Sequence, residues 1–117
     1  MPFPLSREKF VSLEGVEKRR PHYKLSAVQA IVADPGSRPF TVTALRGGLA
    51  LGQSELEMRQ VVLELGHPDF YNSMTTQTDH AVWQDVYHGM TMDGVVVYIK
   101  ITWFPDDRPP VIQFKAK

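Results

Sequence analysis

The stretch "DGVVVYIKITWF", residues 93–104, decides the fold that this sequence predicts. Asp93-Gly94 is a strong hairpin signal, because the tightest hairpin turns need positive φ angles that Asp and Gly tolerate. The residues that follow are β-branched or aromatic and favour a long strand. Side chains alternate between the two faces of a strand. One face is wholly apolar and must face the core: Val95, Val97, Ile99, Ile101 and Trp103. The other face carries Val96, Tyr98, Lys100 and Thr102, so Tyr98 and Lys100 are expected to point away from the core.

Two more strands flank this one. "AVWQDVYH" (81–88) precedes it, and "PVIQFKAK" (110–117) follows after the turn "PDDRPP". Strands joined by such short turns must be antiparallel. In the first strand we expect Trp83, Asp85 and Tyr87 to face inward, which places a carboxylate among core side chains and leaves Gln84 outside. In the last strand the apolar set Ile112, Phe114 and Ala116 puts Gln113, Lys115 and Lys117 on the outer face.

The first half of the chain predicts helices. "PHYKLSAVQAIVADPG" (21–36) reads as a helix with Pro21 in its first turn and a stop at Asp34-Pro35-Gly36. "SELEMRQVVLELG" (54–66) is the clearest helix: Ser54 and Glu57 form a capping box. On it, Leu56, Gln60 and Leu63 are expected to lie on one face, joined by Val61 and Val62 at its edge. A further short helical segment is expected to begin at His67-Pro68-Asp69.

Between these helices we expect a short strand over Phe40–Thr43. Thr43 also suits the cap of a short turn before "RGGLALG", whose glycines argue against a long helix. Helices first and a strand meander after give an α+β domain, an antiparallel sheet with N-terminal helices packed on one face. Residues 1–16 are interpreted as an N-terminal extension, either a tail or a short helical segment. Residues 17–117 are interpreted as one domain, which suits a chain of 117 residues.

Composition narrows the function. The chain has no cysteine, so thiolate metal sites and disulfides are excluded, and it has no apolar run of signal-peptide or membrane-spanning length. A cytoplasmic protein that does not enter a membrane is expected. Its formal net charge is zero, unlike that of a strong nucleic-acid binder, so any RNA contact must be local. The four histidines lack metal-ligand spacing, although His80 or His88 has the chemistry of an acid or base near neutral pH.

The outer sheet face has two interpretations at this stage. It carries Gln84, Tyr98, Lys100, Gln113 and Lys115. Such a polar face is the ordinary solvated side of an antiparallel sheet. The same residues also suit a phosphate site, because lysines offset the charge of a phosphorane, glutamine donates a hydrogen bond, and tyrosine stacks on a base or transfers a proton.

Four segments carry a family resemblance: "EKRRPHYKLSAVQAIV", "PDFYNSMTTQTDHAVWQDVY", "VYIKIT" and the terminal "VIQFKAK". Together they resemble MqsR, the motility quorum-sensing regulator toxins, from about residue 17 to residue 117. The resemblance implies a RelE-like fold and the toxin of a type II toxin–antitoxin system. It implies a sequence-specific mRNA interferase that cuts single-stranded mRNA at GC-containing sites, without the ribosome and without a metal or other cofactor. The implied partner is an MqsA antitoxin, a zinc-binding helix-turn-helix protein that also represses the operon.

The resemblance also implies a site. The family's catalytic Gln, Tyr and C-terminal Lys match Gln84, Tyr98 and Lys115, which lie on the outer face that alternation selects. The family's remaining Lys is replaced by Asn72, which donates a hydrogen bond but carries no charge. Lys100 is a supporting cation, and Tyr71 is a candidate base-stacking residue. The expected reaction is attack of a ribose 2′-OH on the adjacent phosphate.

Two other functions stay open at this stage. One is a catalytically weakened toxin homologue that acts mainly through antitoxin binding and operon regulation, which Asn72 favours. The other is an interaction domain of unknown role, which requires the motif match to be accidental.

Overall fold

The computed structural model describes residues 9–12, 15–76, 78–79 and 81–117, with side chains from residue 17 onward. The elements of this part run in the order β1 (Lys9–Ser12), β2 (Gly15–Lys18), α1 (Leu25–Ala33), α2 (Val42–Ala50), α3 (Glu55–Leu63), the 3₁₀ turn η1 (His67–Asp69), β3 (Phe70–Thr75), β4 (Trp83–Met90), β5 (Val96–Thr102) and β6 (Val111–Ala116). None of the described helices has the length and apolar character needed to cross a membrane.

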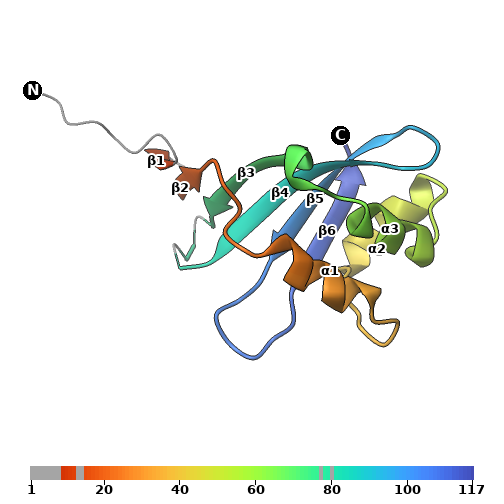
Figure 1. Ribbon diagram of the computed structural model, residues 1–117, viewed down its shortest axis with the longest axis horizontal. Coiled ribbons are helices and arrows are strands. Elements are labelled where there is room, and N and C mark those ends of the chain that lie inside the picture. The colour runs from red at the N-terminus through yellow and green to blue at the C-terminus, as the bar shows by residue number, and fades with distance from the viewer. Residues whose placement is uncertain (1–8, 13–14, 77, 80) are drawn as a thin grey trace, which may run out of the picture.

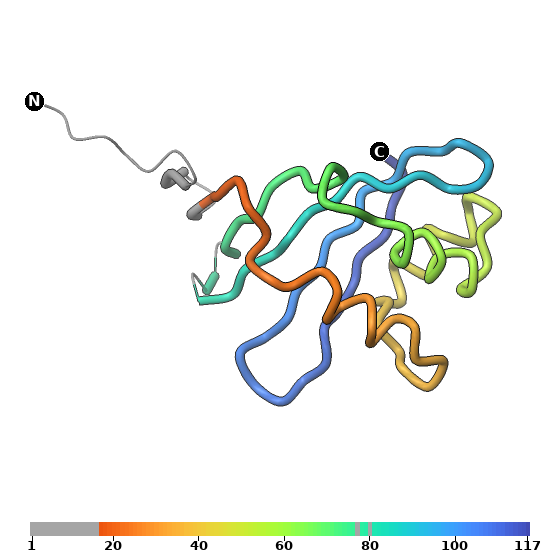
Figure 2. The backbone as a smooth tube through the Cα atoms, in the orientation of Figure 1, coloured from red at the N-terminus to blue at the C-terminus, as the bar shows by residue number. Residues whose placement is uncertain are grey.

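The described strands form one antiparallel sheet in the order β1-β2-β3-β4-β5-β6, so each strand lies beside its neighbour in sequence (Figure 1). The tube in Figure 2 shows the same meander with the three helices gathered at one end. The predicted α+β class and the three-strand meander β4–β6 are confirmed. Residues 9–12 and 15–18 are strands, where a tail or helix was expected; most of the predicted extension 1–16 lies outside the described residues. The domain boundary at residue 17 stays a prediction.

Strand β3 was missed by sequence reasoning. The helical segment expected from His67 onward is a single 3₁₀ turn, and the chain then enters the sheet at Phe70. The side chains that β3 buries are Ser73 and Thr75, which are polar. A strand whose inward positions are hydroxyl residues lacks the apolar alternation on which strand prediction depends.

The core lies between one sheet face and the helices. Val97, Ile99 and Ile101 of β5 are fully buried, as alternation predicted. They pack with inward residues of β4 and β6 and with apolar residues of all three helices. The core members include Val28, Val32, Ala44, Met58, Val61, Val62, Tyr87, Ile112 and Phe114. The predicted inward positions of Asp85, Tyr87, Ile112 and Phe114 are confirmed, whereas Trp83 is only half-buried and Ala116 is exposed at the end of β6. The face with Tyr98 and Lys100 points away from this core.

The inward carboxylate of Asp85 is 1% exposed and accepts several hydrogen bonds. The backbone N–H of His22 donates to both its oxygens at 3.0 Å, and that of Tyr23 donates at 2.8 Å. The Ser73 hydroxyl of β3 donates to the same carboxylate. These bonds explain why α1 begins at Leu25 and not at Pro21, as expected. The N–H groups of residues 22 and 23 are turned toward the sheet, in an extended approach to the helix.

The strand expected over Phe40–Thr43 is wrong. Phe40 makes one parallel bridge to Ile112 of β6, and Thr41 then caps α2, its Oγ1 accepting from the Ala44 N–H at 3.0 Å. This helix of nine residues runs through the two glycines that argued against a long helix, because they allow close packing. A Cβ on Gly47 would lie 3.0 Å from the Phe114 carbonyl oxygen, and one on Gly48 would clash with the Met58 sulfur.

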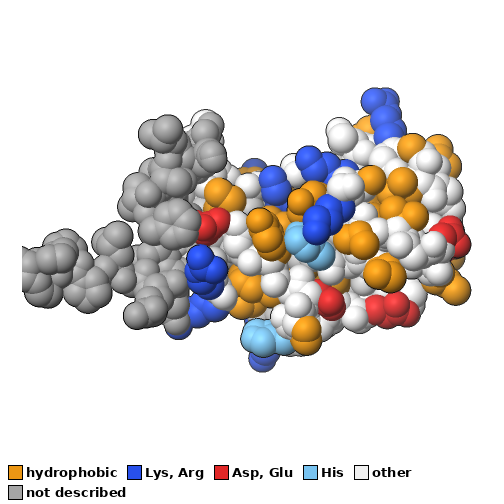
Figure 3. Space-filling model, turned by 90° about the horizontal axis from the view of Figure 1, so that it is seen from above, with side chains coloured by type: hydrophobic (Ala, Val, Ile, Leu, Met, Phe, Trp, Pro, Cys, Tyr) orange, Lys and Arg blue, Asp and Glu red, His pale blue; other side chains and the backbone are white. Residues whose placement is uncertain are grey.

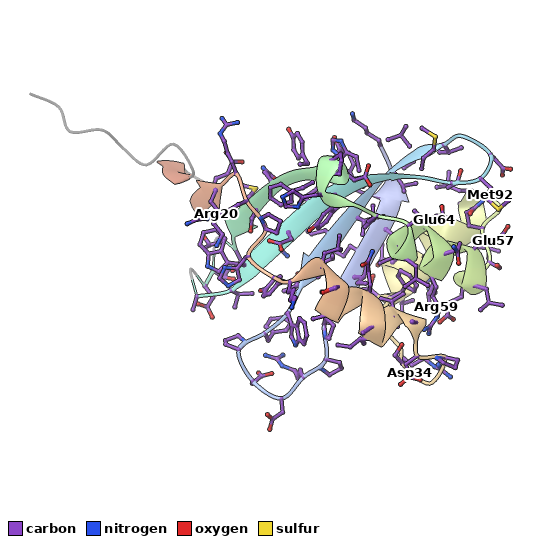
Figure 4. All side chains as sticks on the ribbon, viewed as in Figure 1. Arg20, Asp34, Glu57, Arg59, Glu64 and Met92 are labelled. Carbon is purple, nitrogen blue, oxygen red and sulfur yellow. The ribbon has the colours of Figure 1, made fainter. Side chains whose placement is uncertain are left out.

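Helix α3 has the predicted capping box between Ser54 and Glu57. Of the face predicted for it, Val61 and Val62 are buried and Leu63 packs against the core, but the rest is not. Leu56 is 76% exposed, and Gln60 is also exposed, whereas Met58 and Arg59 are buried. The Arg59 guanidinium donates to the carbonyl oxygens of Val32 (2.8 Å) and Asp34 (2.9 Å). It thereby bonds carbonyl groups at the end of α1 that no helical partner reaches. Figure 4 labels Arg59 and Asp34, which lie on the same side of the molecule.

We expect Asp85→Ala to destabilise the protein strongly. The substitution leaves the His22, Tyr23 and Ser73 donors without their acceptor, and each buried unsatisfied group costs about 1–3 kcal/mol. The free energy of unfolding, measured by urea denaturation, should fall by at least about 3 kcal/mol. The matched control is Asp93→Ala in the exposed β4–β5 turn, where a change within about 0.5 kcal/mol is expected. Equal losses in both variants would contradict the role assigned to Asp85.

Candidate functional site

The strand register arranges the outer-face side chains in three rows across the sheet. The first row runs Asn72, Val86, Lys100, Gln113 from β3 to β6. The second row runs His88, Tyr98, Lys115. The third row runs Met74, Gln84, Thr102, Val111. Residues directly opposite one another on neighbouring strands have Cβ atoms about 5 Å apart, so Tyr98 and Lys115 are immediate neighbours.

A cavity of about 530 Å³ lies over the first two rows. Five of the six residues singled out from the sequence line it: Tyr71, Asn72, Tyr98, Lys100 and Lys115. The start of α2 adds a rim of Thr41, Thr43 and Ala44. Figure 3 shows Lys and Arg side chains beside a histidine and several hydrophobic side chains in the middle of that view.

Gln84 lies apart from the other five. It lines a second cavity of about 520 Å³, and its Nε2 donates to the Thr102 hydroxyl at 3.1 Å. Gln113 lines both cavities, so the two adjoin on the same sheet face. Rows one and three are two residues apart along each strand, about 7 Å. Gln84 therefore stands next to the lysine-lined cavity without forming part of its wall.

Tyr71 owes its position to a β-bulge. Phe70 pairs with Tyr87 and Asn72 pairs with Val86, which leaves Tyr71 as an extra, unpaired residue of β3. Its side chain is 58% exposed and stacks on the His88 ring, with centroids 4.6 Å apart. His88 in turn meets Tyr98 edge to face at 4.9 Å. Three rings thus form a continuous row that ends at Lys115 on the neighbouring strand.

The two lysines supply the positive charge of the cavity. Neither Lys100 nor Lys115 forms an ion pair with a carboxylate in the described part of the chain. The Asn72 side chain stands at the opposite edge, and its Nδ2 donates to the carboxylate of Glu17 in β2. Asn72 therefore brings an amide and a neighbouring negative charge to the place where the family resemblance implies a lysine.

The surroundings of His88 favour its neutral form. Burial, helped by the positive charge of Lys117, lowers the pKa of its imidazole below the ordinary value. Its Nε2 atom is buried and has no hydrogen-bond partner among the described residues. Sequence alternation places His88 on the outer face, but only the structure shows that two tyrosine rings enclose it. The other expected acid–base candidate, His80, lies outside the described residues.

Several residues of the site were not expected from the sequence. Thr41 and Thr43 were assigned to a strand, and the cap signal of Thr41 before "VTAL" is what would have placed them at a helix start. Nothing in the sequence indicates that Glu17 meets Asn72, because the contact spans 55 positions. Among the described residues, no group of three His, Asp or Glu side chains is placed to hold a metal ion.

Comparison with known proteins identifies relatives over most of the chain. Residues 20–116 match the family described as motility quorum-sensing regulator, toxin of MqsA. The chain is similar to the mRNA interferase toxin MqsR of Escherichia coli strain K12, with 41% identity over 102 residues. That alignment covers 87% of this chain and the whole of the relative. The motif match is therefore not accidental, which removes the interpretation as an unrelated interaction domain.

The lowered pKa of His88 predicts a pH-dependent stability. In the unfolded chain this imidazole binds a proton below about pH 6.5, whereas in the folded protein it binds one only at lower pH. The free energy of unfolding therefore falls as the pH drops through this range. The pKa of His22 is lowered as well, by burial and Lys18, and acts in the same direction. Urea midpoints at pH 7.5 and 5.5 should differ more in the native protein than in His88→Gln. The same pH difference in both proteins would show that His88 does not contribute.

Proposed function

This chain belongs to the family of motility quorum-sensing regulators that are toxins of MqsA, and we propose that it is an mRNA interferase, an endoribonuclease that cuts single-stranded mRNA. One observation carries the proposal beyond family membership. Lys100, Tyr98 and Lys115 line a single cavity on the outer sheet face, and neither lysine is neutralised by a described carboxylate. A phosphate in this cavity meets two cations and a phenol, which is the chemistry that phosphoryl transfer requires.

The reaction that these groups suit is internal transesterification. The ribose 2′-oxygen attacks the adjacent phosphorus and loses its proton, the bond to the 5′-oxygen breaks, and that oxygen gains a proton. The products are a cyclic phosphate and a free 5′-OH, and no metal enters any step. Lys115 and Lys100 stabilise the negative charge that grows on the phosphorane oxygens. Tyr98 stands opposite Lys115 and orients the nucleophile or passes a proton.

The remaining residues bind the RNA on either side of the reacting phosphate. Tyr71 presents an exposed ring at the bulge, already stacked on His88, and offers a surface for a base. Gln84 holds the backbone from the adjoining cavity, its amide oriented by Thr102. GC-containing target sites and independence from the ribosome follow from the family resemblance. The substrate places the enzyme in the cytoplasm, and its partner is an MqsA-type antitoxin that binds zinc and carries a helix-turn-helix.

Lys115→Ala should slow cleavage of a GC-containing single-stranded transcript by about 10²–10³-fold, because it removes one preorganised donor to the transition state. The assay is run in EDTA with mapping of the new 5′ ends, which should carry a hydroxyl group. Lys24→Ala is the matched control, since Lys24 is exposed and lines neither sheet cavity. Native rates in both Lys115→Ala and Tyr98→Phe would show that the reaction takes place elsewhere.

A second candidate function is a weakened toxin that acts mainly through antitoxin binding and operon regulation. The contact between Asn72 and Glu17 favours it, because a neutral amide beside a carboxylate makes this edge of the cavity less attractive to phosphate than a lysine would. The lysines on β5 and β6 remain, so we favour cleavage at a reduced rate over complete loss.

Asn72→Lys separates the two candidates. Placing a cation at this position adds a charged donor, so RNA cleavage in EDTA should rise by about tenfold or more over the native protein. Asn72→Gln is the matched control, because it lengthens the side chain without adding charge and should leave the rate near native. Cleavage by the lysine variant alone would establish the weakened homologue. If the native protein cleaves as fast as Asn72→Lys, Asn72 does not lower the cleavage rate.

A further inference from the structure

The turn between β5 and β6 carries a stacked and braced arginine. The guanidinium carbon of Arg108 lies 3.9 Å from the centroid of the Phe104 ring. The Arg108 Nε donates to both oxygens of Asp106, at 3.1 and 2.9 Å, and its Nη2 lies 2.7 Å from the same carboxylate. The Arg108 backbone N–H also donates to Asp106, at 2.9 Å. The guanidinium plane is therefore backed by a ring on one side and fixed at its edge.

The outer side of this arginine is open, since 61% of its side chain is exposed. A planar guanidinium held flat against a ring is a surface on which a nucleobase stacks. Such a platform needs no rearrangement before it binds, because the contacts to Phe104 and Asp106 already fix its orientation. The turn extends beyond the end of the sheet at the bottom of Figure 1.

This platform lies in the cavity next to the lysines. Arg108 and Phe104 line the same cavity as Gln84 and Thr102, and that cavity shares Gln113 with the one that holds Lys100 and Lys115. An RNA strand whose phosphate lies between the two lysines therefore meets the arginine platform within a short distance along the sheet face.

The charge of the second cavity selects a base over a phosphate. Two carboxylates line it, Asp79 and Asp106, against the single cation Arg108, which Asp106 already neutralises. A phosphate would be repelled there, whereas the amide and hydroxyl groups of Gln84, Gln113 and Thr102 are partners for the edge of a base. The first cavity thus suits a phosphate, because of its lysines, and the second suits a base, because of its neutral hydrogen-bonding groups.

We propose that the β5–β6 turn is a nucleobase subsite that binds one nucleotide flanking the scissile phosphate, with the base stacked on the Arg108 guanidinium. The proposal rests on the function proposed above and extends it, because it assigns this chain a contact outside the reacting groups. The subsite makes the cleavage rate depend on the presence of a base at one defined position of the RNA.

The test uses short single-stranded RNAs with one cleavage site, in which each flanking nucleotide in turn is replaced by an abasic ribose. Stacking of one base contributes about 1–3 kcal/mol, so kcat/KM of the native protein should fall about five- to a hundred-fold for loss of the base at one position. Arg108→Gln should lower kcat/KM on intact RNA by a similar factor, and it should no longer distinguish intact from abasic RNA at that position.

Two further variants show whether stacking or charge causes the effect of Arg108→Gln. Arg108→Lys keeps the charge but loses the planar face, so it should behave as Arg108→Gln does if stacking matters. Arg38→Gln makes the same change of charge in the loop before α2, away from both cavities, and should keep the full abasic penalty. Each variant's urea midpoint shows that the fold is intact.

The outcomes separate the two proposals. Failure of the native protein to cleave any of the RNAs would overturn the proposed nuclease function itself. Native cleavage with an abasic penalty that persists unchanged in Arg108→Gln would overturn the subsite alone. An Arg108→Lys variant that retains the native penalty would show that charge, and not stacking, acts at this turn, and would also overturn the subsite. Weakened antitoxin binding by Arg108→Gln with an unchanged abasic penalty would assign the turn to the partner instead.

Discussion

The buried carboxylate of Asp85 is the constraint on which the rest of the structure depends. A charge placed inside a fold is tolerated only when hydrogen-bond donors surround it. Here the donors come from the segment before α1 and from β3, so one side chain of β4 joins three parts of the chain. Because side chains alternate along a strand, holding residue 85 inward also fixes its neighbours. Gln84 and Val86 must then face outward, where each aligns with the outer-face residues paired to it on β3 and β5.

The helix α2 completes the site from the other side. Its two glycines remove the side chains that would hold it away from β6 and from Met58, and the helix settles against the edge strand of the sheet. This cover protects an edge that would otherwise expose unpaired backbone groups. It also brings Thr41 and Thr43, at the start of the helix, to the rim of the lysine-lined cavity. The packing of α2 against β6 therefore also forms one wall of the cavity.

Sequence reasoning succeeded where one physical rule dominates. In β5 and β6 every inward residue is apolar, so alternation alone separated Ile99 from Lys100 and brought Tyr98 and Lys115 to one face. It failed where burial is satisfied by polar groups, as for Ser73 in β3 and Arg59 in α3, because their partners are distant in sequence. It also misjudged the α2 glycines, whose packing partners no local pattern reveals. The family resemblance selected the site residues but did not indicate that Gln84 belongs to a neighbouring cavity.

The neutral net charge of the chain constrains how it can recognise RNA under the proposed function. Binding that depends on phosphate charge grows with the number of phosphates neutralised, and the cavity offers only Lys100 and Lys115 for this purpose. Carboxylates lie on both sides of it, Glu17 beside Asn72 and Asp106 in the β5–β6 turn. A long basic track is thus absent from this described face, and most of the binding free energy must come from rings, amides and hydroxyl groups.

The stretch from residue 69 to residue 87 contains no Lys or Arg and supplies many of those groups, including Tyr71, Asn72 and Gln84. Its unusual composition therefore matches a protein that holds a few nucleotides by stacking and hydrogen bonding, and reserves charge for the one phosphate that reacts.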